Sequence, residues 1–162
     1  MSWYRKAAEQ GLADGQFNLG NMYADGQGVP QDYASAIMWL RRAADQGDAR
    51  AQSNLGVRYV DARGVPQDYA AAAAWYRRAA EQGNAAAQAN LGSMYFNGQG
   101  VPRDYVQAYK WLNLAVSRSS AAEKSKFDVA KYARDQAAKM MTATQIAEAQ
   151  KQAREWKPKP ER

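Results

Sequence analysis

Small and apolar side chains recur at helical spacing along the chain, which predicts amphipathic helices. Within residues 49–59, one helix face carries the apolar set Ala51, Leu55, Gly56 and Tyr59. Within residues 69–82, another face carries the set Ala72, Trp75, Tyr76 and Ala79. Because turn residues separate the two segments, the pattern predicts a helical hairpin.

The turn residues support this hairpin. Gly64 allows a backbone conformation that is closed to other residues, and Pro66 stiffens the entry to the second helix. Asp68 stands where its side chain caps that helix. Gly83, like Gly47 one hairpin earlier, stands where a left-handed residue ends a helix.

The hairpin repeats with a fixed period. Trp3, Trp39, Trp75 and Trp111 are each 36 residues apart, and the Leu-Gly pair, the Pro and the Asp-Tyr pair recur in the same phase. A period of this length is typical of a solenoid, in which each unit buries its apolar face by stacking on its neighbours. We therefore expect an all-α solenoid, a class that offers an extended binding surface more often than a catalytic pocket.

Two turn positions differ in how strictly glycine recurs. The first position holds Gly26, Ala62 and Gly98 in successive repeats. The second holds Gly28, Gly64 and Gly100. Since only the second position is always glycine, we expect a positive φ there and not at Ala62.

The repeated string Ala-x-Ala-Gln-x-Asn-Leu-Gly-x-x-Tyr, followed by Gly-Val-Pro-x-Asp-Tyr and Trp-x-x-x-Ala-Ala-x-Gln-Gly, resembles the Sel-one-like repeat family, a relative of the tetratricopeptide repeat. The resemblance covers about residues 3–117. It implies a right-handed α/α superhelix that acts as a scaffold or adaptor in protein complexes, without a fixed partner. Many members of the family are bacterial.

The register also divides the chain. We expect the end of a partial repeat at 1–10, three repeats at 11–46, 47–82 and 83–119, two capping helices at 120–156 and a basic tail at 157–162. In the third hairpin Asn113 and Leu114 replace the Arg-Arg pair of the earlier repeats, and Ser119 replaces the terminating glycine. A polar face thereby becomes apolar, so we expect further helices to cover it.

Two covering helices are predicted after the third hairpin. The first follows a capping box at residues 120–123 and has the apolar stripe Phe127, Ala130, Ala133, Ala137 and Met140. The second follows a capping box formed by Thr142 and Gln145 and ends before Pro158. Its stripe is Ile146, Ala149, Ala153 and Trp156. The tail at 157–162 is either a solvated end or a basic docking peptide.

Composition narrows the chemistry. The chain has no Cys and no His, which argues against the usual zinc sites, thiol nucleophiles and histidine bases. Of the net charge of +6, residues 118–162 supply +5, with 11 basic and 6 acidic side chains. The repeats are therefore almost neutral and lack the basic stripe of a nucleic-acid binder. No apolar run is long enough to span a membrane.

The recurrent acidic side chains have a structural explanation. Asp32, Asp68 and Asp104 stand at helix starts, where N-capping is a better interpretation than acid or metal chemistry. Residues 25–32 lack the alternating oxygen ligands of a calcium loop, and no strand precedes Gly26 as a phosphate-binding loop requires. We expect no catalytic residue, no cofactor and no metal.

The varying positions of the first helix of each repeat suggest a binding face, because stacking residues must repeat whereas partner-facing residues need not. These positions share one face, and they are Asp14, Arg50 and Ala86; Phe17, Ser53 and Ala89; Asn21, Val57 and Ser93; and Ala24, Val60 and Phe96. We call this face the first-helix stripe and expect it to line the concave surface. A merely solvated face is the alternative, although exposed Phe and Val are poor choices for one.

The candidate partner-binding residues are Phe17, Asn21, Arg50, Ser53, Asn54, Val57, Val60, Asn90, Ser93 and Phe96. We expect Phe96, Val57 and Val60 to be the apolar anchors. Asn18, Asn54 and Asn90 recur beside the stripe. Their amides either pair with the peptide groups of an extended ligand or tie neighbouring helices together.

We interpret the chain as a protein-interaction scaffold or adaptor module that binds a protein or peptide segment on its concave face and is monomeric. The alternatives are a structural spacer without a groove ligand and an accessory domain of an enzyme. No leader pattern precedes Trp3, which the register places in the middle of a helix. We therefore expect a module of a longer protein, either cytoplasmic or exported.

Overall fold

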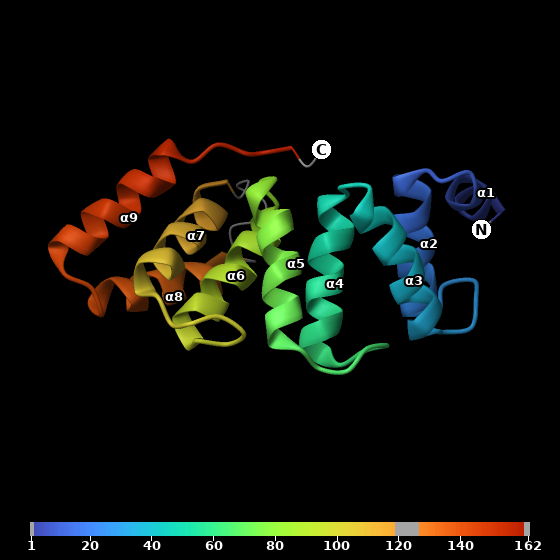
Figure 1. The fold of residues 1–162 in the computed structure, drawn as a ribbon, viewed down its shortest axis with the longest axis horizontal. Helices are drawn as coiled ribbons and strands as arrows, with labels where there is room; N and C mark the ends of the chain where they lie inside the picture. The colour runs from blue at the N-terminus through green and yellow to red at the C-terminus, as the bar shows by residue number, and fades with distance from the viewer. Residues whose placement is uncertain (1, 119–126, 161–162) are drawn as a thin grey trace. The chain divides into compact units, whose positions relative to one another are not determined.

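The computed structural model describes residues 2–118 and 127–160, and within these ranges it contains α-helices and no strand (Figure 1). The helices are α1 (Ser2–Glu9), α2 (Ala13–Asp25), α3 (Tyr33–Asp45), α4 (Ala49–Asp61), α5 (Tyr69–Glu81), α6 (Ala85–Asn97), α7 (Tyr105–Arg118), α8 (Asp128–Lys139) and α9 (Ala143–Glu155). The predicted 49–59 and 69–82 helices correspond to α4 and α5. The all-α fold built from successive helical hairpins is confirmed.

The chain forms two compact units that meet within α5. Unit 1 extends to Ala79 and contains α1 to α4 and most of α5. Unit 2 spans Ala80–Pro160 and contains α6 to α9. Within unit 1, α2 packs on α1 and α3, and α3 packs on α4; within unit 2, α6 packs on α7 and α8.

A glycine lets the first helix of each repeat approach the second closely. In unit 1 a Cβ on Gly56 would lie 2.5 Å from the Tyr76 ring, and a Cβ on Gly20 would lie 2.9 Å from Leu40. In unit 2 a Cβ on Gly92 would lie 2.7 Å from Leu112. These separations leave no room for a side chain, which explains why the Leu-Gly pair recurs in every repeat.

A buried glutamine ties each first helix to the helix before it. The Nε2 atoms of Gln16 and Gln52 donate to the backbone oxygens eight residues earlier, at Ala8 (3.3 Å) and Ala44 (3.1 Å). Gln88 makes the same 3.1 Å bond to Ala80. The role of these glutamines was not predicted, although their recurrence every 36 residues is a visible signal of a shared contact.

The two units differ in whether the side-chain carbonyl oxygen of this glutamine accepts a hydrogen bond. In unit 1, Nε2 of Gln46 donates to Oε1 of Gln16 at 2.7 Å. Two repeats later the corresponding residue is Arg118, whose guanidinium lies over the Trp156 ring, 5.1 Å from its centroid. Oε1 of the buried Gln88 consequently has no hydrogen-bond partner among the described residues.

The predicted N-caps are confirmed. Asp32 accepts hydrogen bonds from the backbone N–H groups of Ala34 and Ser35, which start α3. Asp68 and Asp104 each accept one from the third residue of the helix that follows, at 2.9 and 3.0 Å. These carboxylates cap the N-termini of helices, as their recurrence indicated.

The prediction for Ala62 is wrong. Gly64 has the expected positive φ of 84°, but Ala62 is also left-handed, with a φ of 56°. The reason is that Ala62 is the C-cap of α4, and its N–H donates to the Arg58 carbonyl, just as Gly98 caps α6 by donating to Met94. The C-cap geometry overrides the preference of alanine for negative φ.

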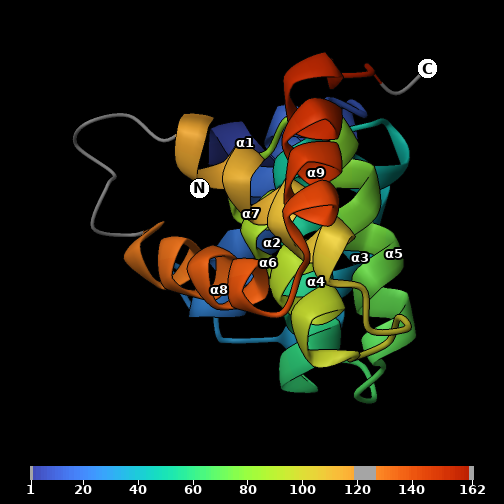
Figure 2. The same ribbon diagram turned by 90° about the vertical axis from the view of Figure 1, so that its left-hand side faces the viewer.

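Both predicted covering helices are present, and Figure 2 shows α8 and α9 beside α7. Ala130 and Ala137 of α8 are buried, and so is Leu114, which sequence analysis expected to be covered. Met140 is 60% exposed, which corrects the end of the predicted stripe, because α8 stops at Lys139. The predicted capping box at 120–123 and Ser119 lie outside the described residues.

Helix α9 packs as its stripe predicted. Its capping box between Thr142 and Gln145 is confirmed, and Ala149 and Ala153 are buried. Trp156 meets the ring of Trp111 edge-on, with centroids 6.2 Å apart.

The segment after α9 is not simply solvated. The backbone N–H of Lys159 donates to the Glu81 carbonyl at 2.8 Å, and Pro158 lies against Gly83. The backbone of this segment therefore satisfies a carbonyl at the end of α5, which corrects the expectation of a free end for its described residues.

The tryptophans are only partly core residues. Trp111 is 5% exposed, whereas Trp39 and Trp75 are half-buried beneath the guanidinium groups of Arg42 and Arg78. Trp3 is 83% exposed, so the recurring tryptophan position is not a core position in every repeat.

Candidate partner-binding face

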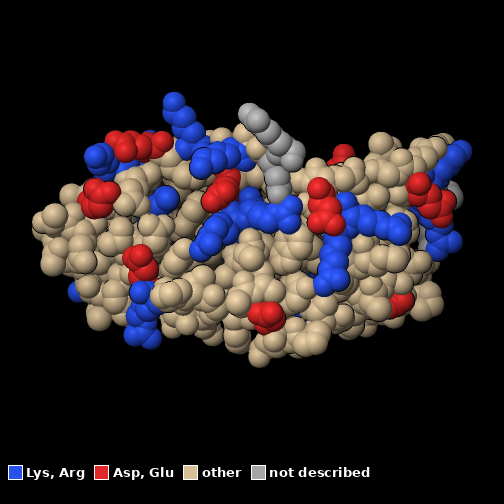
Figure 3. Space-filling model, in the orientation of Figure 1, with Lys and Arg blue, Asp and Glu red and all other residues tan. Residues whose placement is uncertain are grey.

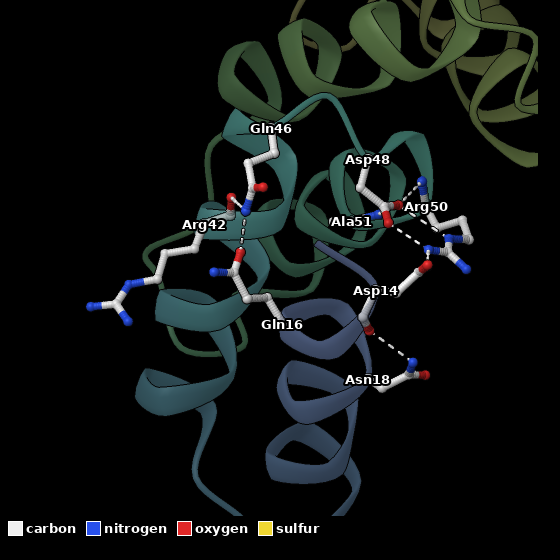
Figure 4. A network of polar contacts seen from close by, with 8 residues as sticks. All are labelled: Asp14, Gln16, Asn18, Arg42, Gln46, Asp48, Arg50 and Ala51. Atoms are coloured by element: carbon white, nitrogen blue, oxygen red, sulfur yellow. Dashed lines mark hydrogen bonds and ion pairs between the residues drawn. The ribbon is translucent and has the colours of Figure 1, made fainter. Parts of the chain in front are cut away.

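In unit 1 the first-helix stripe is filled by the protein's own side chains. The Arg50 guanidinium lies over the Phe17 ring, 4.5 Å from its centroid, and forms ion pairs with Asp14 and Asp48 (Figure 4). Phe17 also packs against the apolar cluster of α3 and α4. The Phe17 ring thus lies between the core and Arg50, which with Asp14 and Asp48 forms a charged cover.

The charges in this cover stabilise one another. Hydrogen bonds to Asp48 and then to Asp14 raise the pKa of Arg50. Burial pushes the pKa of Asp48 upward, but hydrogen bonds from Arg50 and the Ala51 N–H outweigh it, and the pKa is lowered. With two carboxylates around one guanidinium, Arg50 has little unsatisfied charge to offer a partner.

The asparagines of unit 1 make internal contacts. Nδ2 of Asn54 donates to Oδ1 of Asn21 at 2.8 Å, which joins the first helices of two repeats. Nδ2 of Asn18 donates to the Asp14 carbonyl of its own helix at 2.8 Å. Asn54 therefore ties neighbouring helices together, whereas Asn18 bonds only within its own helix.

The remaining stripe residues of unit 1 differ in accessibility. Ser53 is 6% exposed, so its inclusion among the partner-binding residues is corrected, because a buried hydroxyl presents nothing to a partner. Ala24 is buried as well, whereas Val57 and Val60 are half-buried.

In unit 2 the stripe borders a hollow of about 530 Å³. Its floor is α6 and its other side is the start of α8, and its lining is uncharged: Asn84, Ala85, Ala86, Ala89, Asn90, Ser93, Phe127, Val129 and Ala130. Ala89 stands at the position of Phe17, 72 residues later, so this site has a methyl group where unit 1 has a ring. Val129 is 76% exposed at the edge of the hollow.

The polar groups of the hollow come from α6. The Ser93 hydroxyl donates to the Ala89 carbonyl at 3.0 Å, and the Asn84 side chain caps α6 by accepting from the Ala87 N–H. The half-buried Asn90 amide has no hydrogen-bond partner among the described residues. Asn90 thus differs from Asn18 and Asn54, whose amides are engaged.

Phe96 lies away from the hollow and packs internally. Its ring meets Tyr105 edge-on, with centroids 5.6 Å apart, and contacts the apolar cluster of α7 and α8. Phe96 was predicted to be an anchor because its position varies between repeats. The structure shows that a position can also vary between repeats because one of the residues found there makes a local core contact.

Charge and metal chemistry give no further site. On the surface drawn in Figure 3, acidic side chains lie among the basic ones. In the described residues there is no cluster of three or more carboxylate, His or Cys side chains able to hold a metal. A helix of the length and apolarity needed to cross a membrane is likewise absent from that part of the chain.

Hairpins tied by a recurring glutamine and packed through a recurring glycine define a helical repeat protein. The Sel1 repeat profile matches residues 1–12, 13–48, 49–84 and 85–120, so the chain belongs to the Sel1 repeat family.

Two solved structures resemble the chain. A Sel1 repeat protein from Oxalobacter formigenes has 38% sequence identity and a TM-score of 0.68; the match covers 76% of this chain and 93% of that one. A protective antigen of uropathogenic Escherichia coli with an SLR fold has 33% identity and a TM-score of 0.69; the match covers 96% of this chain but 40% of the antigen. A search of the curated proteins gave no match.

Proposed function

We propose that the chain is a protein-interaction module that binds a neutral peptide segment of a partner in the hollow between α6 and α8. Sel1 repeat proteins are generally protein-interaction scaffolds, and the fold is typically non-catalytic. The observation that carries the proposal is the uncharged hollow of about 530 Å³ on the first-helix stripe of unit 2.

Comparison of the repeats supports this location. Unit 1 covers the same stripe with Phe17 and Arg50, whereas Ala86 and Ala89 leave it open in unit 2. An apolar partner side chain entering the hollow would meet Phe127 and Val129 on one side and the alanines on the other. Removing this apolar surface from water favours binding.

Asn90 gives the segment a polar contact. Its amide can donate to a carbonyl and accept from an N–H of an extended backbone, which fixes orientation without selecting side chains. Because no charged residue lines the hollow, we expect a neutral segment and weak dependence of the affinity on salt.

A structural spacer is the second candidate. The internal packing of Phe17 and Phe96 favours it, because both rings expected to be exposed anchors stabilise the protein's own fold. A spacer would leave the hollow without a ligand.

The test uses peptides selected from a displayed random library against the intact chain. Ala89→Phe places in the hollow the ring that unit 1 already has at the same position. We expect it to weaken peptide binding at least about tenfold, because a filled hollow cannot admit the anchor side chain. Isothermal calorimetry measures the change.

Ala74→Phe is the matched control, since Ala74 is an exposed residue of α5 and outside the hollow. It should leave the dissociation constant unchanged. Equal affinities of Ala89→Phe and the unaltered chain, or failure to select any peptide that competes for the hollow, would favour the spacer.

A further inference from the structure

The buried Gln88 of α6 has one half of its side-chain amide unsatisfied. Its Nε2 donates to the Ala80 carbonyl at 3.1 Å, but its Oε1 has no hydrogen-bond partner among the described residues. Gln88 is 0% exposed, so bulk water does not reach this oxygen. A buried acceptor without a donor destabilises the state that contains it, because the oxygen is hydrogen-bonded to water in the unfolded chain.

Unit 1 shows how the same oxygen is satisfied in another repeat. Nε2 of Gln46 donates to Oε1 of Gln16 at 2.7 Å, and Figure 4 shows the two amides facing each other. The donor lies 30 residues after the acceptor, and the residue 30 positions after Gln88 is Arg118. Arginine has a longer side chain than glutamine and several N–H donors. Arg118 therefore has the register, the reach and the donors to bind Gln88.

Arg118 instead contacts the segment that follows α9. Its guanidinium lies over the Trp156 ring, 5.1 Å from the centroid. The guanidinium and Pro158 both lie against Gly83, because a Cβ added to Gly83 would be 3.3 Å from Nη2 of Arg118 and 3.7 Å from Cγ of Pro158. Trp156 and Pro158 therefore hold Arg118 at the turn between α5 and α6.

This turn lies next to Gln88. The N–H of Gly83 donates to the Ala80 carbonyl at 3.0 Å, and the same carbonyl accepts the hydrogen bond from Gln88. Rotation of the Arg118 side chain would therefore carry its donors toward the Gln88 oxygen while α7 stays in place.

Residues 156–160, which we call the strap, are held by few contacts. The backbone of Trp156 is extended, with φ of −67° and ψ of 135°, and its ring meets Trp111 edge-on, with centroids 6.2 Å apart. Lys159 stands between two prolines, which have no backbone N–H, and its own N–H donates to the Glu81 carbonyl at 2.8 Å. The strap residues after Trp156 are exposed. The contact between Trp156 and Arg118 is thus a large part of what fixes the strap.

We infer that Trp156 and Gln88 compete for Arg118, and that the strap is a latch released when Arg118 turns to Gln88. In the docked state Arg118 lies over Trp156 and the Gln88 oxygen stays unsatisfied. In the released state Arg118 donates to Gln88, and departure of the strap uncovers the Glu81 carbonyl and an edge of Trp111. The unsatisfied oxygen destabilises only the docked state, which lowers the free energy needed for release. The latch operates whether or not a ligand occupies the hollow between α6 and α8.

Trp156→Ala in the intact chain removes the competing ring. In nuclear magnetic resonance spectra, the Arg118 guanidinium protons should exchange with water at least about tenfold more slowly than in the unaltered chain, because they become bonded to a buried oxygen. The side-chain carbonyl carbon of Gln88 should change its chemical shift at the same time. Guanidinium protons that exchange as before, with the Gln88 carbon unmoved, would overturn the inference.

The matched control adds Gln88→Met to Trp156→Ala, which removes the acceptor and keeps a side chain of similar length. The slow exchange of the Arg118 protons should then be lost. Slow exchange that persists without the oxygen would show that Gln88 is not the alternative partner. Should the double variant fail to fold, the Gln88 carbon shift of Trp156→Ala alone decides between the two results.

Gln88→Met alone tests the competition from the other side. The Lys159 amide is bonded to Glu81 only while the strap is docked, so its hydrogen exchange measures release. We expect exchange at least about threefold slower than in the unaltered chain, because the released state has lost its hydrogen bond to Arg118. A merely structural role of Gln88 would speed exchange or leave it unchanged, and either of these results would contradict the latch.

Discussion

The same helical stripe is closed in unit 1 and open in unit 2. In unit 1, Phe17 fills the space beneath Arg50, which is held by Asp14 and Asp48. In unit 2, Ala89 stands at the Phe17 position and the space is a hollow beside α8. The same position can therefore vary between repeats for two reasons. In one repeat a large side chain completes the fold, and in another a small side chain leaves room for a ligand.

The largest expected effect comes from removing the cover of unit 2. A chain ending at Arg118 loses α8 and α9 and exposes Leu112 and Leu114, which are buried in the intact protein. Burial of two leucines contributes roughly 3 kcal/mol or more, so we expect unit 2 to unfold or aggregate. Light scattering and a urea unfolding curve measure this, and a soluble chain with an unchanged midpoint would contradict it.

Removing the Phe17 ring from the first-helix stripe of unit 1 should lower the free energy of unfolding less than the truncation of unit 2 does. Phe17→Ala removes a half-buried ring from beneath Arg50, and we expect the free energy of unfolding to fall by about 2 kcal/mol. Ala89→Phe should change it by much less, because the hollow has room for the ring. Chemical denaturation of both variants compares the units, and equal losses would show that the hollow is a packed part of the fold.

The C-cap residues of α4 and α6 allow two substitutions that should have opposite effects on stability. Ala62→Gly in unit 1 should stabilise the protein by about 1 kcal/mol, because glycine adopts a φ of 56° without strain. Gly98→Ala in unit 2, where φ is 71°, should destabilise it by a similar amount. Thermal unfolding measures both, and shifts of the same sign would refute the explanation.

The smallest effect is expected at the charged cover. Arg50→Ala should lower the free energy of unfolding by less than about 1 kcal/mol, because Arg50 and Asp14 are largely exposed.

This contribution has a defined pH dependence. The folded-state pKa of Asp48 is lowered, so its stabilisation is present above the unfolded pKa of about 3.9 and is lost as pH falls through the folded value. In urea titrations, the difference between Arg50→Ala and the unaltered chain should therefore shrink as the pH falls below the unfolded pKa of about 3.9. A difference that grows on acidification would contradict the assignment.

Periodicity predicted most of the fold because stacking residues must recur. The Leu-Gly pair, the capping aspartates and both covering helices follow from spacing alone. Ala62 was missed because a capping hydrogen bond imposed a left-handed backbone on a residue that disfavours it. The signal that could have predicted it is the glycine at the same position of the other two repeats, Gly26 and Gly98, which are left-handed C-caps as well.

The candidate site was less predictable than the fold. Variation between repeats identified the stripe, but it could not separate Phe17 and Phe96, which complete the core, from Ala89, which leaves a hollow. The hollow depends on where α8 lies against α6, a tertiary contact that repeat spacing does not encode.

The central claim is that a partner segment binds unit 2 and not the closed stripe of unit 1. Nuclear magnetic resonance titration of the intact chain with a library-selected peptide tests it most directly. We predict the largest shift changes at the Ala89 methyl, the Asn90 side-chain amide and the Val129 methyls. Changes confined to Phe17, Arg50 and their neighbours, with the hollow unperturbed, would contradict the claim.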